Sequence, residues 1–324
     1  MLIREISLDK IDFEDETFRI SEDVFSETLL TSIQRIGQLN PVVLVEKNER
    51  YRVVCGFRRL KALQRLKATK VAGRLLEGKI QLAAGLFDFA VWDNLSHRQL
   101  DPLEAARVVY KLNVEFGLAE DVLIETYLPR LGLPAHAQTI SAQIALHTSH
   151  PAIRKLFKEG RLTLATVEIL AEMHPSTMEK FASVMNRIRL SASRQRKFFS
   201  LLEDMAAIND SNPDDVFNDA RITEVLENDR LTPGERGEGV YEILYRYRYP
   251  KMSDAERLFE ERINSLGLPG TIHISSDPYF ETSDLQVAFT ARNPVSFRKL
   301  ATELYEASRK PVLDLLYNID GQVP

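Results

Sequence analysis

The chain contains very little cysteine, with one residue, Cys55, among 324. A single thiol cannot form an internal disulfide bond, which fits the reducing cytoplasm. Long apolar runs are also missing, since none approaches the roughly 20 residues that span a bilayer. The stretch MLIREISLDK at the start lacks the apolar core of a signal peptide. We therefore expect a cytoplasmic protein with no membrane partner.

Acidic residues are absent from positions 52–74, although the whole chain has a formal net charge of -5. That segment has eight basic residues: Arg52, Arg58, Arg59, Lys61, Arg65, Lys67, Lys70 and Arg74. The reverse holds for residues 203–238, where eleven acidic side chains stand against three arginines. Because clustered carboxylates repel anions, we expect any anion site in the first two thirds of the chain.

Length and composition predict an ordinary soluble protein of two or three domains, because 324 residues exceed the usual size of a single core. Strand and helix signals alternate in residues 1–98, helical signals dominate residues 99–208, and both kinds return in residues 209–324. The sequence therefore predicts an α+β protein. It would comprise a small mixed-sheet N-terminal domain, an all-α middle domain and a small α+β C-terminal domain of unknown role.

Short local signals predict the individual elements. VVLVE and YRVVC, separated by KNER, predict a hairpin, and KVAGRLLEG predicts a further strand. Ser21 is the predicted N-cap of a helix that ends at Gly37, and Asp101 with Glu104 predicts a capping box. TIHIS and LQVAFTA predict two strands near the C-terminus, followed by a final helix over residues 296–316.

An apolar strand, Gly56 and a helix start with Arg58 and Arg59 form the pattern of a phosphate-binding turn. Glycine lets the backbone approach a ligand, and a helix N-terminus presents free N–H groups. Arginine adds bidentate contacts to phosphate; the alternative for the same residues is a solvated basic helix face. Further along, Asp93 and Asn94 are adjacent oxygen donors that suit Mg²⁺, or else a loop or cap pair.

Taken in order, these segments resemble the ParB family over residues 1 to about 205. The matching stretches are SIQRIGQLNPVVLV, Gly56-x-Arg58-Arg59 with Ala62, the Asp93-Asn94 pair, LDPLEAARVV, LFKEGRLTLATVEIL and LSASRQRKFFSLLEDM. The resemblance implies a ParB/sulfiredoxin-like N-terminal domain and a helical domain with a helix-turn-helix. Residues from about 209 onward lie outside it.

In that family the Gly-x-Arg-Arg turn binds the triphosphate of CTP, and CTP switches a dimer into a clamp on DNA. Carried over, Gly56, Arg58 and Arg59 would be phosphate ligands, while Asp93 and Asn94 would serve Mg²⁺. The resemblance implies that four further residues line the nucleotide pocket: Thr31, Ser32, Gln38 and Pro41.

The resemblance also implies a homodimer, DNA as a partner and a ParA-type ATPase as a further partner. Such ATPases are often recruited by a segment ahead of the ParB domain, and the chain begins close to its first predicted strand. We therefore expect a partition-related or regulatory role more than partition in the strict sense.

The chain departs from the family pattern around the same turn. Phe57 stands where the family commonly has glutamate, Asp93 where glutamate is usual, and His97 aligns with a common arginine, with Arg98 next to it. A lost carboxylate could remove hydrolysis, change the nucleotide or leave binding intact. The sequence therefore identifies no catalytic residue and leaves CTP hydrolysis open.

The resemblance places a helix-turn-helix at residues 119–146. Its second helix, AHAQTISAQIALH, has no lysine or arginine. The candidates for reading base edges are Gln138, Thr139, Ser141 and Gln143, since glutamine pairs well with adenine. The nearby candidates for phosphate contacts are Arg154, Lys155 and Lys158. The alternative is a packing helix in a domain that has lost its affinity for DNA.

Two other classes of function stay open. One is a nucleotide-dependent small-molecule kinase or transferase on the same fold, and the other is a non-catalytic adaptor that binds a protein. Phe57 favours these two, whereas the helical-domain resemblance favours the DNA-acting switch. Cys55 precedes the glycine at the end of an apolar strand and is expected to be buried and not redox-active.

Tyr241, Tyr245 and Tyr249 recur every four residues. This spacing predicts an interior or partner-facing stripe on one helix, although the rings could also stack on bases.

Overall fold

The computed structural model describes residues 3–22, 25–76, 83–277, 280 and 282–317. The chain forms two compact units, Met1–Asn186 and Arg187–Pro324. A mixed sheet with helices and a long helical region confirm the predicted α+β class. The division into three domains at residues 98 and 208 stays a prediction.

The N-terminal unit begins with a five-stranded mixed sheet in the order β1-β5-β3-β4-β2. Its strands are β1 (Ile3–Ser7), β2 (Ile11–Asp12), β3 (Val42–Lys47), β4 (Arg50–Cys55) and β5 (Lys70–Leu75). β3 and β4 form the predicted antiparallel hairpin, and β5 is the predicted strand, of which residues 77 and 78 lie outside the described part. The turn works because Asn48 and Glu49 both adopt positive φ angles, which match the twist of a tight hairpin.

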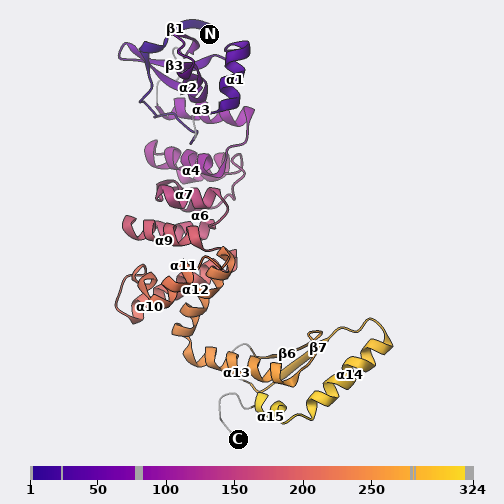
Figure 1. Ribbon diagram of the computed structural model, residues 1–324. Helices are drawn as coiled ribbons and strands as arrows, with labels where there is room; N and C mark the ends of the chain where they lie inside the picture. Colours follow the sequence, from indigo (N-terminus) through magenta and orange to yellow (C-terminus); the bar gives the residue numbers. More distant parts are fainter. Residues whose placement is uncertain (1–2, 23–24, 77–82, 278–279, 281, 318–324) are drawn as a thin grey trace. The chain divides into compact units, whose positions relative to one another are not determined.

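Two helices accompany this sheet, α1 (Glu27–Ile36) and α2 (Phe57–Arg65) (Figure 1). The prediction that Ser21 caps α1 is wrong, because the helix begins later and Ser26 Oγ accepts the Leu29 N–H. Ser21 is buried and its carbonyl accepts hydrogen bonds from two arginines. Gly37 ends α1 as predicted.

An apolar cluster joins α3 (Ala83–His97) to the helical region that follows. Phe87 and Val91 of α3 pack with Val108 and Leu112 in this cluster, and all four are buried. α4 (Pro102–Tyr110) begins with the predicted capping box of Asp101 and Glu104. This core places the end of α3 and the start of α4 beside the sheet.

Further helices complete the N-terminal unit, separated by glycines with positive φ at positions 117, 132 and 160. They are a π-helical turn Lys111–Glu115, α5 (Glu120–Val122) continued by Leu123–Tyr127, α6 (Ala137–Thr148), α7 (Pro151–Lys158) and α8 (Leu164–Ala171), with α9 (Pro175–Arg187) reaching the boundary. Figure 1 shows α4, α6 and α7 as neighbouring layers.

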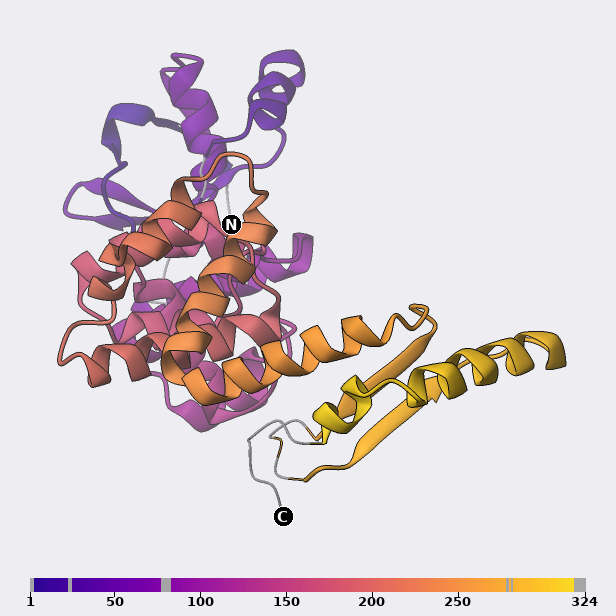
Figure 2. The same ribbon diagram turned by 60° about the horizontal axis from the view of Figure 1, so that its bottom comes forward.

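The C-terminal unit starts with a group of helices, α10 (Ala192–Ile208), α11 (Ala220–Glu227) and α12 (Pro233–Arg248). It continues with α13 (Pro250–Leu266), the predicted strands β6 (Ile272–Ser276) and β7 (Leu285–Phe289), then α14 (Pro294–Ser308) and α15 (Val312–Leu316). The predicted final helix is therefore broken, because Pro311 cannot continue α14. Figure 2 shows the hairpin between α13 and α14.

The helices in the described part of the chain include none that is both long enough and apolar enough to cross a membrane.

Candidate functional site

A cavity of about 300 Å³ lies where β4 ends and α2 begins. Gly56 is the turning point, with φ of 104°. A Cβ atom at this position would lie 2.8 Å from Cγ1 of Val42, so both the backbone angle and the close approach to β3 require glycine. Another part of the wall comes from Asp93 and Asn94 in the last turns of α3 and from Arg98, which follows this helix.

The start of α2 faces this cavity with positive charge. The first N–H groups of a helix have no intrahelical partner, and Gly56 has no side chain to cap them. Arg58 and Arg59 belong to the same first turn and both line the cavity. An anion here would meet free N–H groups, the positive end of the helix dipole and two guanidinium groups.

Two backbone carbonyls in the segment between α1 and β3 hold the Arg59 side chain in place. Its Nη1 donates to the carbonyls of Asn40 at 3.0 Å and Pro41 at 2.6 Å. Burial lowers the pKa of the Arg59 guanidinium, and the nearby Asp93 carboxylate partly offsets this effect. Arginine titrates so far above neutrality that it stays charged, so the site keeps a fixed cation.

Glu104 connects the cavity to α4, and no sequence signal identified this role. Its carboxylate is 1 % exposed and accepts hydrogen bonds from Arg58 Nη2 at 3.2 Å and Arg98 Nη2 at 3.1 Å. Arg98 Nη1 also donates to Glu104 Oε2, and the same oxygen accepts the Asp101 N–H of the capping box. One buried carboxylate therefore orients two arginines and the helix start together.

Asp93 and Asn94 both line the cavity but differ in their hydrogen-bond and ion-pair partners. Asn94 Oδ1 accepts from Arg98 at 3.1 Å, while its Nδ2 donates to the Ala90 carbonyl within α3. Asp93 lies 3.9 Å from Nε2 of His97. Within the described ranges, no group of three or more His, Cys, Asp or Glu side chains could hold a metal ion. A Mg²⁺ ion would thus depend on Asp93 plus phosphate oxygens and water, which is a common arrangement for Mg²⁺.

Cys55 is buried at the end of β4, as its place in the apolar run predicts. Burial raises the pKa of its thiol, and the neighbouring Asp93 carboxylate raises it further. A thiol of this kind stays protonated and unreactive.

The four pocket residues implied by the resemblance are not gathered at this cavity. Thr31 and Ser32 are exposed on α1, whereas Leu29 of the same helix lines the cavity. Gln38 is used structurally, because its side-chain amide exchanges hydrogen bonds of 2.8 and 2.9 Å with the backbone of Ala72 in β5. Pro41 contributes only the carbonyl that Arg59 binds.

The predicted DNA-binding residues also divide by exposure. Gln138 and Ser141 are exposed on α6, and Thr139 is half-buried. Gln143 is only 4 % exposed, since it lies three residues from both Ile140 and Leu146 on the packed face of α6. It therefore cannot reach a base edge from this position.

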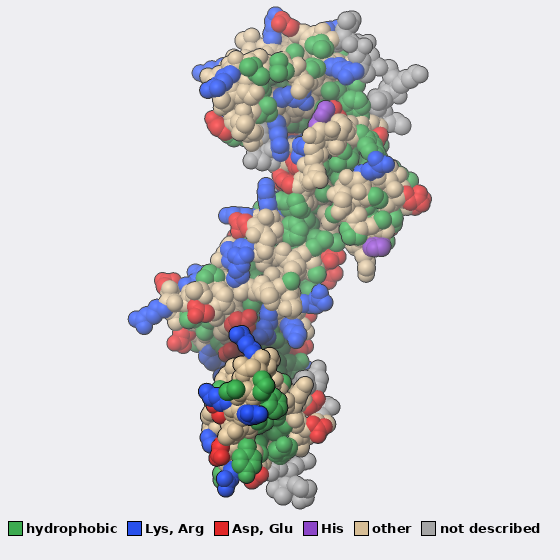
Figure 3. Space-filling model, turned by 90° about the vertical axis from the view of Figure 1, so that its right-hand side faces the viewer, with side chains coloured by type: hydrophobic (Ala, Val, Ile, Leu, Met, Phe, Trp, Pro, Cys, Tyr) green, Lys and Arg blue, Asp and Glu red, His purple; other side chains and the backbone are tan. Residues whose placement is uncertain are grey.

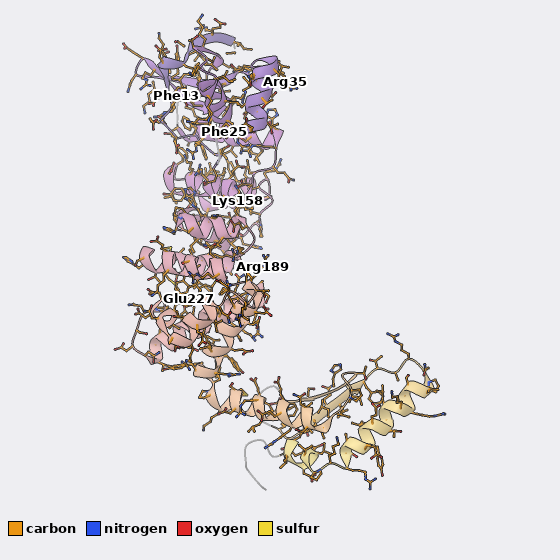
Figure 4. The ribbon with its side chains drawn as sticks, viewed as in Figure 1. Phe13, Phe25, Arg35, Lys158, Arg189 and Glu227 are labelled. Carbon is orange, nitrogen blue, oxygen red and sulfur yellow. The ribbon has the colours of Figure 1, made fainter. Side chains whose placement is uncertain are left out.

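The basic candidates follow on α7. Arg154 Nη1 donates to the His147 carbonyl, whereas Lys155 is exposed. Lys158, labelled in Figure 4, is exposed and lies 3.7 Å from the Asp101 carboxylate. Figure 3 shows one face of the N-terminal unit, on which Lys and Arg side chains are spread among hydrophobic and acidic ones.

The proteins that are similar to this chain carry the name ParB. Residues 2–83 match the ParB N-terminal domain family. The protein named "Probable chromosome-partitioning protein ParB" from Pseudomonas putida is 24% identical over 225 residues, which cover 68% of this chain and 74% of that protein. The protein of the same name from Neisseria meningitidis is 28% identical over 162 residues, which cover 46% of this chain and 52% of its own.

Solved structures give similar matches at lower identity. ParB from Caulobacter crescentus in complex with the centromeric parS site has 17% identity and a TM-score of 0.35, over 60% of this chain and 97% of that one. The same protein with CTP-gamma-S has 21% identity and a TM-score of 0.24, over 57% and 99%. Residues 2–83 therefore match the ParB N-terminal domain, and the chain is similar over 68% of its length to a protein named ParB.

Proposed function

We propose that the chain is a CTP-binding switch that acts on DNA in a partition-related or regulatory role. The observation that carries this proposal is the cavity at Gly56, which is lined by the N-terminus of α2 and by Arg58, Arg59 and Arg98. Such a set of groups suits a polyphosphate, and the match of residues 2–83 to the ParB N-terminal domain favours CTP as its source. A cavity of about 300 Å³ matches the lower end of small-ligand sites.

Within this proposal the phosphates compete with Glu104. Arg58 and Arg98 donate to that buried carboxylate in the structure. A triphosphate offers more negative charge and more acceptors, so both arginines would turn part of their hydrogen bonding toward it. Asp93 would hold Mg²⁺ together with phosphate oxygens, and Asn94 would join only by giving up its bond to Arg98.

Hydrolysis is a separate question, because Phe57 supplies no carboxylate. Its ring packs against the apolar cluster of the sheet and α2, and it also borders a second cavity, which Phe13 lines as well. We therefore propose nucleotide binding as the switch and assign no catalytic residue.

The DNA contact in this proposal uses α6 as the second helix of a helix-turn-helix. Gln138 and Ser141 are exposed and would contact base edges, and the half-buried Thr139 lies next to Gln138 in the chain. Arg154, Lys155 and Lys158 of α7 would add phosphate contacts. Gln143 is left out of this surface because it is buried.

A homodimer belongs to the same proposal. The described residues of α14 include one that is buried, Ala307, while Val295, Phe297 and Tyr305 are more than half exposed. A second copy of the chain would cover these apolar side chains, which a monomer leaves in water.

The proposal is tested by titration calorimetry with CTP, ATP and GTP, each with and without Mg²⁺. We expect CTP to bind and ATP and GTP not to bind. Arg58→Ala should weaken the affinity for CTP roughly tenfold or more, because a charge-assisted contact is lost. Arg35→Ala is the matched control, since Arg35 is an exposed arginine of α1 that does not line the cavity (Figure 4).

Other outcomes of the titration would redirect the assignment. Binding of ATP in place of CTP would favour the small-molecule kinase or transferase, the candidate that Phe57 supports. A lack of heat with all three nucleotides would contradict the proposal and favour the adaptor.

A further inference from the structure

Three tyrosines form a continuous stripe along α12 in the C-terminal unit. The rings of Tyr241 and Tyr245 are nearly parallel with centroids 6.1 Å apart, and those of Tyr245 and Tyr249 lie 5.3 Å apart. The stripe borders two cavities of about 340 and about 670 Å³, which share Tyr241, Tyr245 and Lys197 as lining residues. We call these two cavities together the tyrosine groove. Tyr241 is buried, Tyr245 is half-buried and Tyr249 is exposed, so the predicted stripe runs from the interior to the surface.

The cations at the two ends of the stripe are already neutralised. Arg194 lies over the Tyr241 ring at 4.1 Å and pairs with the Glu238 carboxylate at 3.3 Å. At the other end the Arg248 guanidinium lies 4.8 Å from the Tyr249 ring centroid and pairs with Asp204. Neither arginine is therefore the main binding group for an anion.

Lys197 has a different position. It lies one turn after Arg194 on α10, is exposed, and makes no hydrogen bond or ion pair with the residues that the structure describes. The smaller cavity combines this ammonium group with three tyrosine rings, Leu201 and Met252, and no carboxylate is among its described lining residues. Such a wall suits an aromatic or large aliphatic group that carries a negative charge beside it.

The larger cavity has the opposite charge. Glu242, Glu256 and Glu260 line it, and Tyr245 Oη donates to Glu256 at 3.1 Å. Burial and the Glu256 carboxylate raise the pKa of Tyr245 to about 12, so its hydroxyl stays a donor near neutral pH. A basic group is the complementary occupant of this part.

We propose that the tyrosine groove binds a peptide segment of a partner protein. In this segment an aromatic or large aliphatic residue lies on the tyrosine rings, a carboxylate next to it meets Lys197, and a basic side chain on the other side meets the glutamates. Nucleic acid would also stack on tyrosine, but the three glutamates and the acidic residues 203–238 repel phosphate. The site lies outside the ParB N-terminal domain and does not depend on nucleotide binding.

The test selects a random-peptide phage library on the full chain and measures the affinity of the enriched peptides by fluorescence anisotropy. We expect sequences with the acidic–apolar–basic pattern, and a loss of roughly tenfold or more in affinity for Lys197→Glu and for Tyr249→Ala. The matched controls are Arg196→Glu, the exposed neighbour on α10, and Tyr247→Ala on α12, neither of which lines the groove. Both controls should bind like the wild type.

Each remaining outcome would overturn the proposal. No enrichment above the library background would do so, as would enriched peptides that bind all four variants equally. Oligothymidylate serves as the nucleic-acid probe, and its binding in place of peptide, lost in Lys197→Glu, would assign the groove to nucleic acid.

Discussion

The cavity at Gly56 and the tyrosine groove both contain arginines, but they compensate the charge differently. In the cavity, Arg58 and Arg98 share the single buried carboxylate of Glu104. At the two ends of the tyrosine stripe, Arg194 and Arg248 each have their own carboxylate, on a more exposed surface. The comparison teaches that the number of arginines is a poor guide to an anion site. What matters is how much positive charge is left after the internal partners are counted.

The largest expected effect comes from removing the shared carboxylate. Glu104→Gln leaves two arginines without their buried counter-charge, and we expect a loss of about 3–5 kcal/mol in the free energy of unfolding. Glu238→Gln removes a partner from the groove's exposed pair and should cost less than about 1 kcal/mol. Urea titration measures both, with the fluorescence of the single tryptophan, Trp92 of α3, for the N-terminal unit and far-UV circular dichroism for the other.

A second readout separates competition from simple loss of stability. If Glu104 competes with phosphate, CTP should stabilise Glu104→Gln against urea more than it stabilises the wild type. Equal stabilisation of both proteins would contradict the competition described above.

Replacing glycines by alanine sharpens the comparison at the backbone. Gly56→Ala combines a positive φ with a Cβ only 2.8 Å from Val42, and we expect a cost of about 3 kcal/mol. Gly267 ends α13 with φ of 65°, and its Cβ would meet only the flexible end of Lys310 at 3.4 Å. Gly267→Ala should therefore cost about 1 kcal/mol. Similar costs at both sites, measured by the same urea titrations, would show that the crowding at β3 is relieved by movement.

An effect smaller than those expected at Glu104 and Gly56 concerns pH and a buried lysine. Lys111 Nζ donates to the carbonyls of Glu16 and Thr17, and burial lowers its pKa to about 8 from 10.5. Between these two values the unfolded chain binds the proton that the folded protein has lost, so this group makes stability rise with pH. Between pH 7.5 and 9.5 the free energy of unfolding of the wild type should rise by about 2 kcal/mol more than that of Lys111→Met. If the free energies of unfolding of the two proteins changed equally with pH, this prediction would be contradicted.

Much of the local structure could be predicted, because its causes lie within a few residues. The capping box of Asp101 and Glu104, the hairpin at Asn48 and the end of α1 at Gly37 all follow from side chains or φ angles at the site itself. The wrong cap at Ser21 shows the limit of such signals. Two serines could cap the same helix, but Ser26 Oγ accepts the Leu29 N–H, whereas Ser21 Oγ accepts from Arg98 Nη2 at 3.4 Å.

The site was predicted less completely. Arg58, Arg59, Asp93 and Asn94 do lie around one cavity, but that placement does not test the roles proposed for them. The burial of Gln143 was available in the sequence, because spacings of three to Ile140 and Leu146 place it on the apolar face of its helix.

By itself, the sequence determined the class of fold, the turn at Gly56, the start of α4 at Asp101 and the concentration of positive charge in residues 52–74, since these depend on neighbouring residues and composition. Tertiary structure alone decided that Glu104 holds an arginine 46 residues away, that Gln38 binds the backbone of β5, and that Lys197 lies beside tyrosines with no partner in the described chain. The physical reason is that each of these contacts joins segments far apart in the sequence, and only packing brings them together.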